Sequence, residues 1–291
     1  MSTKFGSIPL GDSDNETIGS ARHSRMSLHG DLKTGPVQFT GYLESDFMNF
    51  TPSQSPYRWR QYWAQARYGK WELLGGQAWS MLRPNRKGIA TESDMLNTDV
   101  IEPAYHVGLV GSRRRQLRLT RTEGNYTMAV AWEANGNWVF KVARESGKIH
   151  LEAGGFSGRS DRRGGFLAQV VPLSPKLRIV GQQFSASRGA DEALGIAPKF
   201  DSGMSAIEGV EAQITKNLEL YSYAGFVYAK RAPGNRAVNE YSLGFNRRVP
   251  APGMWGSMLF SLQYSHFNRA TWLDRVGHMD YVMYRVRYVI N

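Results

Sequence analysis

Arginine side chains inside strongly alternating segments are the residues that first suggest a chemistry for this 291-residue chain. All but Arg114, which lies between two other arginines, have apolar neighbours, and the spacing puts each on the polar face of an extended segment. The six are Arg67, Arg114, Arg118, Arg178, Arg285 and Arg287, with Lys141, Lys148 and His150 beside them. A guanidinium group offers a fork of donors that fits carboxylate or phosphate oxygens. In a confined, wet passage, we expect these groups to concentrate anions.

The same arginines could instead brace the protein. Carboxylates occupy the polar faces of other extended segments, and pairing across the interior would neutralise both partners. These carboxylates are Glu44, Glu133, Glu152, Glu211 and Glu219. The sequence leaves both interpretations open for every one of the six arginines.

A second group of charges lies in the long irregular stretch from Ser80 to Ala104. Loops of this length inside a compact domain usually have a function. Its charged residues are Arg83, Arg86, Lys87, Glu92, Asp94, Asp99 and Glu102. Opposite charges at the narrow point of a passage would orient dipolar solutes, so we expect a constriction loop. An exposed cap or a latch between subunits is the alternative.

The sequence contains no motif typical of an enzyme or of a nucleic-acid-binding protein. The chain has no Cys, and its six His lie in no metal-spaced or nucleophile-activating motif. We therefore expect neither an enzyme nor a cofactor or metal. The net charge of +11 implies an anionic partner. The basic residues are spread over alternating segments without a nucleic-acid-binding motif, so nucleic acid is not expected as that partner.

Strands must position these side chains, because the dominant period along the chain is two. Apolar and polar or small residues alternate through 37–44, 126–133, 257–264 and 281–288. No stretch has a helical pattern. The longest apolar run is Met128 to Trp132, far short of the roughly 18 to 20 residues of a spanning helix. A spanning strand needs only about 9 to 11.

Short turns and long links alternate between these strands. Tight turns occur at 33–35, 69–70, 123–125, 145–147, 174–175, 215–217 and 250–253, and longer links separate them, apart from a brief one at 135–137. To keep the alternation, 105–122 is taken as one long strand. Tight turns on one rim and long loops on the other predict an antiparallel outer-membrane β-barrel.

About fifteen strands result, whereas bacterial barrels close with an even number. We therefore expect one further strand before the first, with the chain truncated at its N-terminus. Residues 1–21, which lack an apolar signal segment, would form an extracellular-type loop or a disordered segment. Residues 22–291 would form the barrel, with loop 80–104 inserted.

A soluble or structural β-barrel would show the same alternation with its apolar face turned inward. Aromatic residues at the ends of apolar faces favour the membrane, as where Tyr126 and Trp132 flank Met128 and Val130. Charges in mid-strand on the opposite faces suit a wet lumen. Arg113 to Arg115 would lie above the bilayer, where they could meet lipopolysaccharide phosphates.

Four motifs in the first half of the chain support this architecture. They are ARHSRMS at 21–27, TGYLESDF at 40–47, RQYWAQA at 60–66 and LLGGQAWS at 73–80, preceded by Ile-Pro-Leu at 8–10. Together they resemble the DcaP-type trimeric porins of Gram-negative outer membranes, over roughly Ile8 to Thr122. The resemblance implies a sixteen-stranded barrel, a homotrimer, a periplasmic coiled-coil stretch and uptake of small carboxylic acids. The C-terminal Asn291 departs from the aromatic residue usual for such barrels.

The sequence thus predicts an outer-membrane diffusion channel for small hydrophilic solutes, preferentially anionic ones such as carboxylates, in contact with outer-membrane lipid. Two alternatives remain. One is a sugar-preferring porin, with a greasy path formed by Trp59, Trp63 and Trp79. The other is a soluble or structural β-barrel without a transport role.

Overall fold

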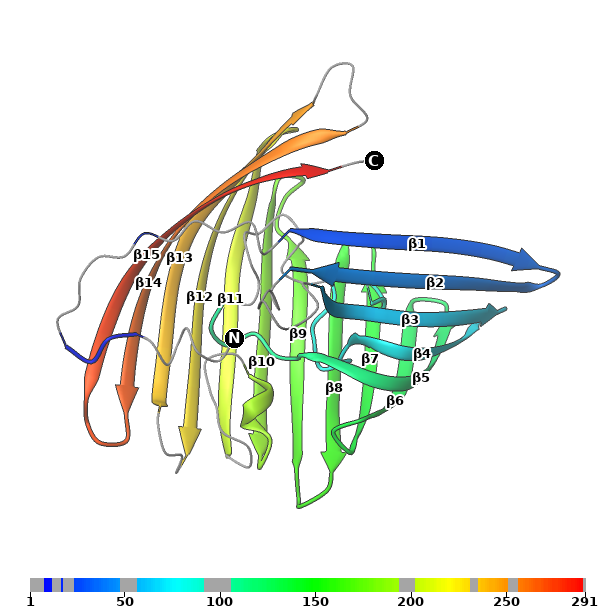
Figure 1. Cartoon of the computed structure of the whole chain (residues 1–291), viewed down its shortest axis with the longest axis horizontal. Helices are drawn as coiled ribbons and strands as arrows, with labels where there is room; N and C mark the ends of the chain where they lie inside the picture. Colours follow the sequence, from blue (N-terminus) through cyan, green and yellow to red (C-terminus); the bar gives the residue numbers. More distant parts are fainter. Residues whose placement is uncertain are drawn as a thin grey trace.

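A computed structural model describes residues 8–11, 17, 24–47, 57–91, 106–193, 202–230, 235–250 and 256–289. It contains one 15-stranded sheet in which each strand pairs with its neighbours in sequence. The first eight strands are β1 (Arg25–Thr34), β2 (Val37–Asp46), β3 (Arg58–Tyr68), β4 (Trp71–Trp79), β5 (Arg113–Glu123), β6 (Tyr126–Glu133), β7 (Asn137–Ser146) and β8 (Ile149–Gly158). The others are β9 (Arg163–Pro172), β10 (Leu177–Ser187), β11 (Ser202–Thr215), β12 (Leu218–Lys230), β13 (Asn235–Pro250), β14 (Ser257–Thr271) and β15 (Val276–Val289). In Figure 1 the sheet curves from β1–β5 on the right to β11–β15 on the left.

All pairings are antiparallel, as the alternation of links predicted. Two-residue turns join β1 to β2 and β5 to β6, and Gly35 and Gly124 take the positive φ that such turns need. The link from β6 to β7 is brief, as expected. In the described residues, no helix has both the length and the hydropathy of a membrane span.

The link between β4 and β5 is longer than the sequence predicted. The strand expected over 105–122 begins only at Arg113, and residues 106–112 continue the irregular segment. Gly108 and Gly111 have φ values of 90° and 96°, outside the range of a strand. At Gly108 a Cβ atom would lie 2.1 Å from the carbonyl oxygen of Ala206, so this part of the link runs directly against the wall.

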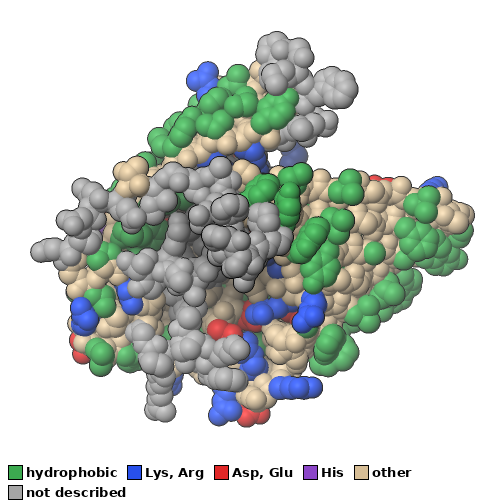
Figure 2. Space-filling model, in the orientation of Figure 1, with side chains coloured by type: hydrophobic (Ala, Val, Ile, Leu, Met, Phe, Trp, Pro, Cys, Tyr) green, Lys and Arg blue, Asp and Glu red, His purple; other side chains and the backbone are tan. Residues whose placement is uncertain are grey.

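Apolar side chains face outward. Along β6, Met128, Val130 and Trp132 are exposed, whereas the alternating Ala129 and Ala131 are buried. On β15, Val286 is 44% exposed. A soluble barrel would bury these side chains, so their orientation excludes that alternative for the fold and confirms the barrel with an apolar exterior. In Figure 2, hydrophobic side chains gather at the right, over β1–β5, and along the last strands at the top, and several charged ones lie in the hollow between these two groups of strands.

Exposed aromatic residues mark the ends of the outer apolar faces. Trp132 and Trp138 pair across β6 and β7 near the long-loop rim. Tyr68 and Trp71 pair across β3 and β4 beside the short-turn rim. Amphipathic rings at both levels are typical of the two interfaces of a lipid bilayer.

The first described residues lie against the last two strands. Arg269 Nη1 donates to the carbonyl oxygen of Ile8 at 2.8 Å, and Arg275 Nη2 donates to that of Leu10 at 3.4 Å. Ile8 is buried, and Gly277 leaves the space that the Pro9 carbonyl group occupies. The expected sixteenth strand lies outside the described residues.

Candidate functional site in the barrel lumen

The link between β4 and β5 is held against the inner wall by its own backbone N–H groups. Met81 N donates to Glu133 at 3.2 Å, Asn85 N to Glu152 at 3.0 Å, and Gly88 N to Glu145 at 2.7 Å. Acceptors on β6 to β8 therefore take the donors that an irregular segment would otherwise leave unpaired.

The later part of the link uses the opposite side of the wall. Val107 N donates to Glu240 of β13 at 2.7 Å, and Val110 N donates to Gln182 of β10 at 3.0 Å. Ser205 Oγ of β11 donates to the Gly108 carbonyl oxygen at 2.9 Å. The segments 80–91 and 106–112 thus fold inward and contact the wall from β6 to β13.

Lys141 of β7 forms a fully buried centre beneath the loop. Its Nζ donates to the Arg83 carbonyl oxygen at 2.8 Å and to Asn85 Oδ1 at 2.6 Å, and it lies 2.9 Å from Glu152 Oε2. A buried ammonium group needs such saturation, because an unpaired one would be strongly destabilising. Lys141 therefore fixes the loop rather than facing an open passage.

A second anchor joins Arg86 to Glu211 of β11. Arg86 Nη1 and Nη2 donate to the two Glu211 oxygens at 3.0 and 2.5 Å. Arg178 donates to the same carboxylate, and so does Tyr223 Oη at 2.6 Å. Burial opposes the charge of Arg86, but the adjacent Glu211 carboxylate outweighs it and raises the pKa of the guanidinium group. The loop residue is thus held as a cation.

Four of the six arginines singled out from the sequence have carboxylate partners. Arg67 lies 2.8 Å from Glu72, and Arg118 lies 3.9 Å from the same side chain. Arg114 pairs with Glu192 at 2.9 Å, and Arg178 pairs with Glu219 at 2.8 Å as well as with Glu211. Of the four, only Arg178 pairs with carboxylates that the bracing hypothesis named, Glu211 and Glu219.

Arg285 and Arg287 lie on the inner face of β15, because Val282, Tyr284 and Val286 between and before them are exposed outside. Their cross-strand partners on β14 are Ser261 and Leu259. On the other side of β14, Arg248 of β13 lies at the same level and also pairs with Leu259. We call Arg248, Arg285 and Arg287 the basic strip. Arg248 was not predicted from the sequence, although the alternation through β13 puts it on the inner face with Glu240 and Asn246.

The remaining wall of this region is polar and includes the carboxylate of Glu240. Tyr221 Oη donates to Gln263 Oε1 at 3.0 Å, Gln263 Nε2 donates to Ser265 Oγ at 2.9 Å, and Ser265 Oγ donates to Glu240 at 3.0 Å. Ser261 Oγ donates to Asn246 at 2.7 Å. These bonds hold the side chains flat on the wall beside the basic strip.

The predicted constriction-loop residues divide into three groups. Arg83 and Arg86 are positioned by the wall, with the Arg83 guanidinium 4.1 Å from the ring centre of Trp79. Lys87 is exposed. Glu92, Asp94, Asp99 and Glu102 lie outside the described residues. No group of side chains suited to a metal ion occurs in the part of the chain that the structure describes.

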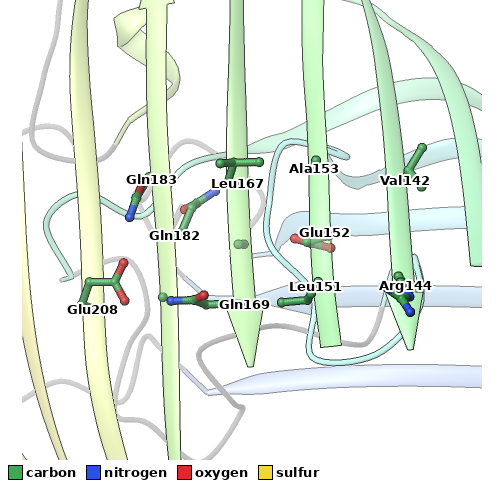
Figure 3. A pocket seen from close by; sticks show the side chains of 12 residues that line it. Val142, Arg144, Leu151, Glu152, Ala153, Leu167, Gln169, Gln182, Gln183 and Glu208 are labelled. Atoms are coloured by element: carbon green, nitrogen blue, oxygen red, sulfur yellow. The ribbon is translucent and has the colours of Figure 1, made fainter. Parts of the chain in front are cut away.

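A polar cluster that was not predicted from the sequence lies on the outer face. Glu208 of β11 hydrogen-bonds with Gln169 of β9 and Gln183 of β10, in a depression of about 380 Å³. Figure 3 shows Gln169 reaching across β10 toward Glu208. Gly181 makes room, since a Cβ there would lie 1.8 Å from the Glu208 carboxylate.

Solved structures share this architecture. The outer-membrane channel DcaP of Acinetobacter baumannii is 16% identical, with a TM-score of 0.73 over 92% of this chain and 85% of that one. A loop-deletion mutant of OmpT from Vibrio cholerae is 10% identical, with a TM-score of 0.60 over 91% of both chains. The anion-selective porin from Comamonas acidovorans is 11% identical, with a TM-score of 0.58 over 91% of this chain and 87% of that one.

The chain has the porin fold. No family model matches it, and no curated protein does. Its similarity to DcaP covers 92% of the chain, well beyond the first half that carried the sequence motifs. The inward-folded loop and the charged inner wall of this chain therefore belong to a barrel with the porin fold.

Proposed function

We propose that this protein is an outer-membrane diffusion channel for small hydrophilic solutes and that it prefers anions such as carboxylates. The observation that carries the preference is the basic strip, in which three guanidinium groups share one stretch of the inner wall. Glu240 is the one inward-facing carboxylate in the described parts of β13–β15, and it accepts from the loop and from Ser265.

Fixed positive charge on a low-dielectric wall raises the local anion concentration and lowers that of cations. Guanidinium groups also suit the planar oxygens of a carboxylate. The porin from Comamonas acidovorans is anion-selective on the same fold, which supports such a preference here. A homotrimer is the assembly expected from the resemblance to DcaP-type porins.

A sugar-preferring channel has less support. Trp59 is 58% exposed on the outer face, whereas Trp63 is buried inside against Tyr42. Trp79 is stacked by Arg83 and Arg113. The three rings therefore do not form one continuous surface for a sugar.

The test is the reversal potential of the protein in a planar bilayer under a salt gradient. We expect the wild type to favour chloride over potassium. Replacing Arg285 and Arg287 together by Glu should shift the reversal potential toward cation preference. Arg121→Glu is the matched control, because Arg121 is exposed on the outer face of β5, at the end near the short-turn rim, where it stacks on Trp71. Cation preference in the wild type would contradict the anion proposal, and absence of conductance would contradict the channel.

A further inference from the structure

A notch lined by arginine lies at the long-loop rim, beside the short link between β6 and β7. It has a volume of about 540 Å³. Its basic side chains come from two places, the start of β5 and the link between β8 and β9. They are Arg113, Arg114, Arg115, Arg159 and Arg162.

Positive charge is in excess in this notch. Arg114 pairs with Glu192 at 2.9 Å, and Arg162 lies 2.9 Å from Asp191. Within the described part of the chain, Arg113, Arg115 and Arg159 form no ion pair. In addition, Arg113 Nη1, Arg114 Nε and Arg162 Nε are buried without a hydrogen-bond acceptor. Buried unpaired donors are costly, and an anion in the notch would supply their acceptors.

The notch opens toward the outer face of the barrel. Arg115 is exposed and pairs with the outward Gln77, and the next outward residue along β5 is Leu117, which pairs with Trp132. Arg115 therefore lies two residues, or roughly 6 to 7 Å, beyond the exposed Trp132–Trp138 pair toward the rim. Aromatic belts mark the bilayer interface, so this is the level of the lipid head groups.

We propose that this notch binds the phosphate groups of an outer-leaflet lipid. Long-loop rims of outer-membrane barrels face outside, and basic pockets at head-group level bind anionic head groups. Fork-shaped donors from Arg113, Arg115 and Arg159 suit phosphate oxygens. The site depends on the barrel lying in a bilayer and is independent of what the lumen transports.

The test measures the affinity of the purified full-length protein, in detergent micelles, for lipid A by native mass spectrometry. The probes are diphosphoryl lipid A, monophosphoryl lipid A and inorganic phosphate. We expect diphosphoryl lipid A to bind more tightly than the monophosphoryl form. Arg115→Gln with Arg159→Gln should weaken its binding by roughly 25-fold. Replacement of both by Lys, which keeps the charge but loses the fork, should weaken it by a few-fold.

Arg121→Gln is the matched control, because it removes an outward guanidinium from the other end of the same strand and should leave the affinity unchanged. Heat-modifiable gel mobility verifies that each variant is folded. Equal affinity of the double Gln variant and the wild type would overturn the proposal, as would an equal loss in the Arg121→Gln control. Binding of inorganic phosphate as tight as that of lipid A would also overturn it, in favour of a solute site. Conductance in phosphatidylcholine bilayers tests the channel separately.

Discussion

Glu211→Gln should release the loop segment 80–91 from the wall. The Glu211 carboxylate is 1% exposed and accepts from Arg86, Arg178 and Tyr223. The substitution removes the charge and replaces one acceptor oxygen by a donor. Two guanidinium groups would then face an amide group. Arg178 is fixed on β10, so Arg86, which lies on the loop, is the group that would move away from the wall.

The magnitude follows from burial. Removing one partner of a buried ion pair costs about 3 to 5 kcal/mol, whereas an exposed pair contributes about 0 to 1 kcal/mol. A loss of about 3 kcal/mol in the anchor corresponds to a rise of roughly 100-fold in the population of the released loop. The exposed pair between Arg188 and Asp161, 3.3 Å apart, provides the control, so Asp161→Asn should change little.

Hydrogen exchange measured by mass spectrometry reads this out directly. The amides of Asn85 and Gly88, which donate to wall carboxylates, should exchange faster in Glu211→Gln, while peptides from β12 should not change. Arg86→Gln leaves Glu211 paired with Arg178 and Tyr223, so it should release the loop without disturbing the wall. Unchanged exchange over 80–91 in both folded variants would refute the anchor.

Two further predictions concern packing. Val130→Arg puts a charge on the outer apolar face and should lower the free energy of unfolding by about 2 to 4 kcal/mol, measured by denaturant titration of the protein in lipid vesicles. An unchanged free energy of unfolding would mean that Val130 does not contact hydrocarbon. Gly277→Val should displace residues 8–11, because a Cβ there would lie 1.7 Å from the Pro9 carbonyl oxygen; limited proteolysis should then cut this segment faster. Gly30→Val is its control, since a Cβ at Gly30 meets no atom within 4 Å, and equal cleavage of the two variants would contradict the contact.

The strands could be predicted from the sequence because every second residue carries the signal. Alternation through β6 and β15 predicted both the strands and their outward faces. The exposure of the apolar residues in the structure confirmed which face points outward. The same pattern misassigned residues 106–112, because Val107, Gly108 and Leu109 alternate like a strand. Backbone donation to Glu240 and Gln182 overrides that pattern.

The pairing of the arginines could not be predicted in the same way. Arg86 and Glu211 are separated by 125 residues, and their contact needs both the inward fold of the loop and the register of β11. The rim notch likewise needs three links to meet at one level, namely those between β6 and β7, between β8 and β9, and between β10 and β11. A sequence pattern assigns a face to a residue, but it does not assign a partner across the lumen.

The direction of the side chains of β15 decides most directly whether the apolar faces of the strands point toward lipid. Because the chain has no native Cys, single cysteines can be placed at 282 to 286 and labelled in proteoliposomes. We predict that a water-soluble maleimide labels positions 283 and 285, and that only a lipid-soluble reagent labels 282, 284 and 286. Uniform labelling, or the inverse pattern, would contradict a barrel with an apolar exterior and a wet lumen.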